Sequence, residues 1–383
     1  MLIIGEIHTA LLPHSRPLTP EEARTALALA VGETVVQWAR PVPHTASPIL
    51  LHGVDCRLPL GPKRGNPHAE DAAPASSVRA VGTVGSRAVL TGGHLLQGSA
   101  WTAVEPPEHP RRMPWSHYLA RPGTLETIGN FDARRLAEGY LAAESRRDRA
   151  GLLNAAAIAR HSLHDVLSRP GLDQRPPIKT GSTRLRWAAI ADPGAGRAVA
   201  FRLVGTDRRR MSLVTGPIEP EQVAAAAEDL AVHDWLLSAV SARIALAKIG
   251  EDPRHTLRTL RPVVDHLLHL WSAGARTSRD LEFMWDSLER RPGLTRQWTT
   301  MTERVRSQID YGAADLAAKM LDLMEDRQRQ TGAADQHYHL SRAVPGRCRR
   351  AGRPVRPGAS CPRVRRTCGS TRARRCRAGP RRR

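Results

Sequence analysis

The last 43 residues of this chain contain almost nothing that could enter a hydrophobic core, so the residues before them must build the fold. From Ser341 to Arg383 the sequence has 16 arginines, no lysine and no acidic residue. After Val344 its only aliphatic side chains larger than alanine are Val355 and Val364. Such a segment cannot bury enough apolar surface to offset the entropy lost on ordering. We therefore predict a disordered basic tail over residues 331–383.

The tail has two interpretations. It could be an arm that binds nucleic acid nonspecifically, through phosphate contacts alone. It could also be a frameshift product, because a GC-rich gene read out of frame yields this mixture of Arg, Pro, Gly, Ala and Cys, and the rest of the chain has 38 arginines against 4 lysines. We favour the second. The tail cysteines lack the paired C-x2-C spacing of zinc sites, so no metal is predicted there; they are Cys348, Cys361, Cys368 and Cys376.

The rest of the chain has the composition of a globular protein. Removing the 16 tail arginines from 58 basic residues leaves 42 against 37 acidic ones, a net charge of +5. At roughly 150 residues per domain there is room for two domains. Cys56 is the only cysteine outside the tail, which excludes a disulfide framework. The chain has no long apolar run and does not begin like a signal peptide, so we expect a cytoplasmic protein without membrane contact.

The periodicity of apolar residues predicts an α+β fold. Residues 1–131 are expected to form a β-rich domain, beginning with a strand at Leu2 and interrupted by one helix with a capping box at Thr19 and Glu22. Residues 132–330 are expected to form a helical domain with a small central β-meander at about 185–215 and a C-terminal helical bundle. In the meander, a Pro- and Gly-containing turn at 192–196 predicts a hairpin.

Strong catalytic motifs are missing from the sequence. It has no phosphate-binding Gly-x-x-x-x-Gly-Lys-Ser/Thr loop and no Gly-x-Ser-x-Gly elbow, and the Gly194-Ala-Gly196 segment precedes a strand pattern rather than a helix. We therefore predict no cofactor. Two histidine pairs spaced i, i+3 could each share a metal, but interleaved leucines favour half-buried helix faces, so no metal is predicted; the pairs are His161 with His164 and His266 with His269. Cys56 is interpreted as a small buried side chain.

Two polar-aromatic stretches are the best candidates for recognition. The first, TGGH, places His94 at a glycine turn, and the second, PWSHYLARPG, gathers aromatic and charged side chains within ten positions. Trp and Tyr are common interface anchors, although they are equally common at half-buried strand edges. The predicted interaction surface consists of His94, Trp115, His117, Tyr118 and Arg121.

Six segments together resemble an actinobacterial protein family of unknown function. They are GEIHTALLPHS (5–15), GVDC (53–56), RAVLTGGHLLQGSA (87–100), PWSHYLARPG (114–123), HDWLL (233–237) and DHLLHLW (265–271). The resemblance covers about residues 1–325 and implies a component of a multi-gene cluster that also encodes a variant P-loop protein and a methyltransferase-like protein. It supplies no catalytic residues, and the arginine tail departs from its pattern.

These observations lead to one expected function and two alternatives. We expect a non-enzymatic partner or adaptor that binds proteins encoded by neighbouring genes. The first alternative is an enzyme of unfamiliar type that uses the histidine clusters. The second is nonspecific nucleic-acid binding through the tail, which would be strongly salt-dependent.

Overall fold

The computed structural model describes residues 1–28, 42–62, 76–143 and 151–342. It contains two compact units, Met1–Leu321 and Asp322–Arg383. The strands are β1 (Leu2–Leu11), β2 (His44–Ala46), β3 (Leu50–Leu60), β4 (Ser76–Thr91), β5 (Leu95–Glu105), β6 (Thr124–Ile128), β7 (Thr183–Ala191), β8 (Ala198–Leu203) and β9 (Arg208–Thr215). The α-helices are α1 (Pro20–Ala26), α2 (Trp115–Leu119), α3 (Ala133–Ala142), α4 (Ala155–Leu167), α5 (Pro220–Leu246), α6 (Pro253–His266), α7 (Glu282–Arg290) and α8 (Leu294–Arg342).

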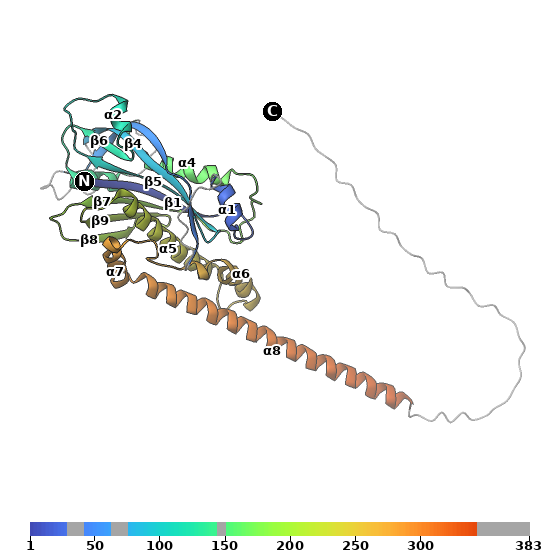
Figure 1. Cartoon of the computed structure of the whole chain (residues 1–383). Helices are drawn as coiled ribbons and strands as arrows, with labels where there is room; N and C mark the ends of the chain where they lie inside the picture. Colours follow the sequence, from blue (N-terminus) through green and yellow to red (C-terminus); the bar gives the residue numbers. More distant parts are fainter. Residues whose placement is uncertain (29–41, 63–75, 144–150, 343–383) are drawn as a thin grey trace, which may run out of the picture. The chain divides into compact units, whose positions relative to one another are not determined.

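The strands of the described residues form one mixed sheet (Figure 1). Its order is β2-β4-β6-β5-β1-β7-β9-β8, and β3 pairs with β4 beside this path. Strand β1 lies between β5 and β7 and is antiparallel to both. The parallel pairs are β5 with β6 and β7 with β9. Because β7 pairs with β1, the predicted β-rich and helical parts share a single sheet.

Strand β1 is buried on both faces of the sheet. Ile3 and Ile7 belong to the core under α5, whereas Leu2 and Ile4 belong to the core under α3 and α4. A strand covered by helices on both faces is apolar at successive positions, which explains the sequence Leu2-Ile-Ile4. Gly5 is required in this strand, because an added Cβ would lie 2.4 Å from the ring of Trp187.

Two helix starts follow directly from local sequence. Thr19 caps α1 by accepting a hydrogen bond from the Glu22 backbone, and the Glu22 side chain accepts one from the Thr19 backbone, as the capping box predicts. Helix α5 begins with Pro220 in its first turn. It packs on β1, β5 and β7, and this packing buries several polar residues along with the apolar ones.

The predicted α+β class is confirmed, with a curled sheet formed largely by the N-terminal part and helices following it. The predicted hairpin between residues 185–190 and 198–204 is wrong in its pairing. Strand β9 lies between β7 and β8, parallel to the first and antiparallel to the second. A Pro- and Gly-containing turn allows a hairpin, but the neighbour of β7 is decided by packing across the whole sheet.

The C-terminal part contains one long helix. Helix α8 continues to Arg342, past the boundary at 331 that the sequence predicted for the tail. The remaining tail residues, 343–383, lie outside the described residues. The choice between a nucleic-acid-binding arm and a frameshift product therefore stays a prediction. Among the described helices, none is both long and apolar enough to cross a membrane.

Candidate functional site

Four of the five predicted interaction residues lie close together. Trp115, His117 and Tyr118 are on α2, and Arg121 follows it before β6. His94 is elsewhere, in the turn between β4 and β5, where it is buried and its Nε2 lies 3.3 Å from Nδ1 of His266. The structure therefore places the PWSHYLARPG stretch at one site and excludes His94 from it.

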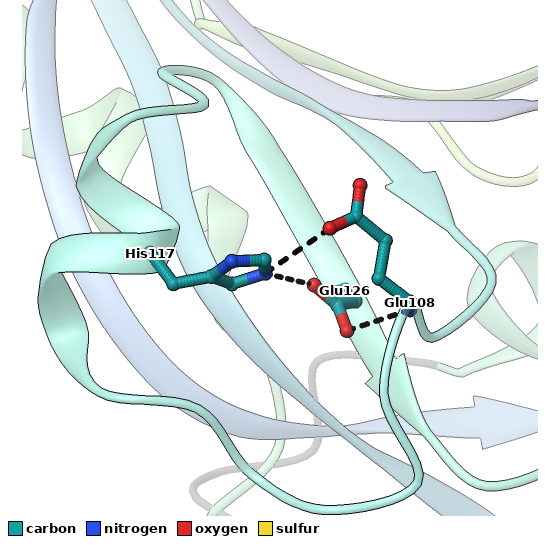
Figure 2. A group of neighbouring side chains, drawn as sticks. All are labelled: Glu108, His117 and Glu126. Carbon is teal, nitrogen blue, oxygen red and sulfur yellow. Dashed lines mark hydrogen bonds and ion pairs between the residues drawn. The ribbon is translucent and has the colours of Figure 1, made fainter.

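Hydrogen bonds fix α2 to β6 (Figure 2). Nε2 of His117 lies 2.7 Å from Oε2 of Glu126, and Oε1 of Glu126 accepts a bond of 2.9 Å from the Glu108 backbone. The hydroxyl of Tyr118, a buried residue, accepts a bond of 3.0 Å from the backbone of Met113. His117 and Tyr118 therefore position the short helix, so they are not themselves the exposed recognition groups.

Glu108, His117 and Glu126 also have the chemistry of metal ligands. Within the described ranges they are the one such group, and their ligand atoms lie within 4.8 Å of one another. The guanidinium group of Arg121 supplies the positive charge beside the two carboxylates that a metal ion would otherwise supply. Its Nη1 is 3.0 Å from Oε1 of Glu108 and 3.8 Å from Oε2 of Glu126, and it also pairs with Glu105. We therefore interpret the group as an ion-pair network that holds α2.

The protein should lose stability on acidification, and part of this loss should come from protonation of Glu126. Burial by itself would raise the pKa of Glu126, but hydrogen bonds from His117 and the Glu108 backbone outweigh it and lower the pKa. The stabilisation is thus present above the unfolded pKa of about 4.3 and is lost as the pH falls through the folded pKa. Melting temperatures measured from about pH 3 to 7 should fall less steeply for Glu126→Gln than for wild type.

The matched control for this prediction is Glu303→Gln. Glu303 is exposed on α8 and forms no ion pair among the described residues. Its replacement should leave the acid limb of the profile unchanged. Parallel profiles for wild type and Glu126→Gln would contradict the assignment of acid sensitivity to this network.

Five large apolar side chains are exposed beside α2. Their exposed fractions lie between 37% and 60%, and we call this surface the apolar edge; it consists of Ile49, Leu50, Leu51, Trp115 and Leu119. Trp115 lies over Gly53 of β3, since an added Cβ there would be 3.4 Å from its ring. Leu51 points to the same face of β3 as Gly53, and Leu119 is one helical turn from Trp115. Leu51, Trp115 and Leu119 are therefore neighbours, and Ile49 lies against Gly85, the β4 partner of Leu51, whereas Leu50 points to the opposite face of β3.

The apolar edge also borders backbone groups of β3 that have no hydrogen-bond partner among the described residues. Strand β3 pairs with β4 on one side only, and alternate residues direct their backbone groups to the other side. Arg57 does so, because its N–H donates to Gly151 (2.6 Å) and its C=O accepts from Leu153 (3.1 Å). By the same alternation Leu51 and Gly53 face outward, and their backbone groups have no partner among the described residues on that side.

Sequence reasoning predicted Trp115 in this surface but not β3 or its leucines. The sequence did contain an indication of this strand, because Ile49-Leu-Leu51 is an apolar run directly after Pro48. Whether such a run is buried or exposed depends on what covers it, and that is decided by the sheet order.

The other candidate residues lie apart from this site. His161 and His164 are exposed on α4, whereas His266 and His269 lie at and just after the end of α6. Among the described residues neither pair gathers a third ligand at metal-binding distance. Cys56 is buried, as predicted, and burial raises the pKa of its thiol to about 12, which keeps it protonated and unreactive.

Comparisons with protein-family models, curated proteins and solved structures gave no match.

Proposed function

We propose that this chain is a cytoplasmic, non-enzymatic partner protein that binds an extended, apolar segment of another protein along the apolar edge. The observation that carries the proposal is the coincidence of five exposed apolar side chains with outward-facing backbone groups of β3. Exposed apolar patches of this kind are typical of interaction sites. An extended segment satisfies both features at once, because its backbone pairs with the strand and its side chains cover the leucines.

The edge lacks the usual devices against unwanted pairing. Natural edge strands commonly carry lysines, prolines or inward-pointing charges. The outer half of β3, residues 50–54, carries none of these; its charges begin at Asp55, which is bound to Arg79 at 2.7 Å. A strand edge that a partner normally covers does not need such residues, so their absence from residues 50–54 supports the proposal.

The test is complex formation with the two gene products that the resemblance implies as neighbours, a variant P-loop protein and a methyltransferase-like protein. Each is purified and titrated against this chain by calorimetry, and one of them should bind. Leu51→Lys should weaken that binding at least about tenfold, because a desolvated ammonium costs more than 1.4 kcal/mol at an apolar contact. Leu203→Lys is the matched control, since Leu203 is also an exposed leucine, 66% exposed on β8 against 49% for Leu51.

Three results would contradict the proposal. The first is that neither of the two soluble proteins binds this chain. The second is binding that Leu51→Lys and Leu203→Lys weaken equally. The third is self-association of this chain, measured by sedimentation, that Leu51→Lys abolishes, because a second copy would then be the occupant of the apolar edge.

A further inference from the structure

The free part of the β3 edge is short, because another segment of this chain closes one end of it. The outward N–H and C=O of Arg57 are bonded to Gly151 and Leu153, and this contact is parallel to β3. A strand that is added along the apolar edge must therefore end before it reaches Arg57. Since β3 begins at Leu50, the added strand has room for about seven residues, one opposite each residue of β3.

The side chain at this closed end is a cation without a counter-charge. Arg57 is exposed and lies on the same face of β3 as Leu51 and Gly53, since alternate residues of a strand share a face. Among the described residues no carboxylate forms an ion pair with its guanidinium group. Its cross-strand neighbour on β4 is Arg79, and like charges directly opposite each other destabilise a sheet. A negative group beside Arg57 would relieve this repulsion.

The carboxylate of Asp55, on the same face of β3, is already bound by two other arginines. Nε and Nη2 of Arg79 donate to its two oxygens at 2.8 and 2.7 Å, and Nε of Arg112 lies 3.4 Å from Oδ2. The hydrogen bonds from Arg79, together with the charge of Arg112, lower the pKa of Asp55, so it is ionised at neutral pH. One negative charge therefore stands beside three positive ones, those of Arg57, Arg79 and Arg112.

The carboxylates of the ion-pair network under α2 are too far away to cancel this charge. Glu126 faces the same side of the sheet as Asp55, because Val81 of β4 pairs with both, but it is already bound to His117 and lies near Arg121. A partner strand on the outer side of β3 would be three strand spacings, about 14 Å, from Glu126. This distance exceeds the Debye length of about 10 Å at 0.1 M salt, so the effect of Glu126 there is screened.

Arg112 joins the apolar edge to this positive end. Its guanidinium group lies over the ring of Trp115, 5.6 Å from the ring centroid, and its side chain is 37% exposed. Trp115 in turn lies over Gly53. Apolar and basic groups therefore form one continuous surface along β3, from Leu51 to Arg57.

We propose that the partner segment bound along the apolar edge is about seven residues long and carries an acidic side chain at the end that meets Arg57. Its apolar side chains cover Leu51 and Trp115, and its backbone pairs with the outward groups of β3. Its carboxylate accepts hydrogen bonds from the guanidinium groups of Arg57 and Arg112. The inference rests on the proposed function and adds the length and the charge of the partner segment.

The experiment is a fluorescence-anisotropy titration of the full chain with labelled peptides of about seven residues, blocked at both ends. Each peptide alternates valine and threonine and has glutamate, glutamine or lysine at its first or its last position, because a partner strand can run parallel or antiparallel to β3. In one of the two orientations the glutamate peptide should bind at least about fivefold more tightly than the lysine peptide, with the glutamine peptide between them. Added salt should reduce this preference.

The length is tested by extending the tightest-binding peptide beyond its glutamate with further valine and threonine residues. The extension should not strengthen binding, because residues 151–153 occupy the edge of β3 at that point. Extension at the opposite end of the peptide is the control for a general effect of peptide length.

Variants of the body separate this site from the arginine-rich tail, which attracts acidic peptides in every variant alike. Arg57→Glu should reverse the preference, so that the lysine peptide binds more tightly than the glutamate peptide. Arg112→Gln should reduce the preference. Arg197→Glu is the matched control, because Arg197 is an exposed arginine near Phe283 and its replacement changes the net charge equally; it should leave the preference unchanged.

The outcomes distinguish a failure of this inference from a failure of the proposed function. If the peptides bind and Leu51→Lys weakens their binding, but Arg57→Glu changes the preference no more than Arg197→Glu does, the acidic end is wrong and the proposed function stands. If extension beyond the glutamate strengthens binding, the inferred length is wrong. If no peptide binds, or if Leu51→Lys leaves binding unchanged, both the inference and the proposed function are wrong.

Discussion

Glu228→Ala should lower the free energy of unfolding by about 3–5 kcal/mol, the largest loss that we expect from a single charged residue of this chain. The carboxylate is fully buried and forms ion pairs with two guanidinium groups, those of Arg87 and Arg276. Its removal leaves both positive charges buried with no counter-charge. Urea unfolding followed by far-ultraviolet circular dichroism measures the change.

The control for Glu228→Ala is Glu221→Ala, two turns earlier in α5. Glu221 is exposed, so its replacement should change stability by no more than about 0.5 kcal/mol. If Glu228→Ala costs less than about 1 kcal/mol, the three side chains do not form a desolvated cluster.

Gly98→Ala should cost about 3 kcal/mol, because β5 and α4 touch at this residue without room for a methyl group. A Cβ on Gly98 would lie 2.0 Å from the carbonyl oxygen of Ala159 and 2.8 Å from Cβ of Leu163. The first obstacle is backbone, so α4 must shift as a whole instead of one side chain rotating. Overpacking of this kind typically costs 1–3 kcal/mol, and a backbone contact belongs at the upper end.

Gly196→Ala tests the same substitution where space is open. No atom lies within 4 Å of a Cβ at Gly196, in the turn before β8. Its free energy of unfolding should change by less than about 1 kcal/mol. Similar losses for the two variants would show that the close packing of α4 on β5 is not what makes Gly98 necessary.

The candidate sites differ in how far the sequence could predict them. The PWSHYLARPG stretch was identified from its composition, because its aromatic and charged residues are neighbours in the chain. The buried cluster of Arg87, Glu228 and Arg276 was not identified, since Arg87 and Glu228 are 141 positions apart and Arg276 is a further 48 away. Each is an ordinary charged residue in its own segment, and only packing brings the three together.

His94 shows the opposite error. A histidine after two glycines in a turn has the local pattern of an exposed, adaptable residue. In the fold, Gly93 instead lies against the backbone of Leu18, and His94 is buried. The glycines allow close approach of another segment, a role that the sequence pattern cannot distinguish from an exposed turn.

Local chemistry was sufficient for the features that neighbouring residues decide. The capping box at Thr19 and Glu22 fixed the start of α1, and the apolar run at Leu2 marked a strand, because hydrogen-bonding groups and apolar periodicity act within a few positions. The tertiary structure alone decided that β7 joins β1, that Leu50 and Leu51 of β3 stay exposed, and that Glu228 meets two distant arginines. These outcomes depend on which surfaces cover one another, and burial is a property of the whole packed chain, not of any one segment.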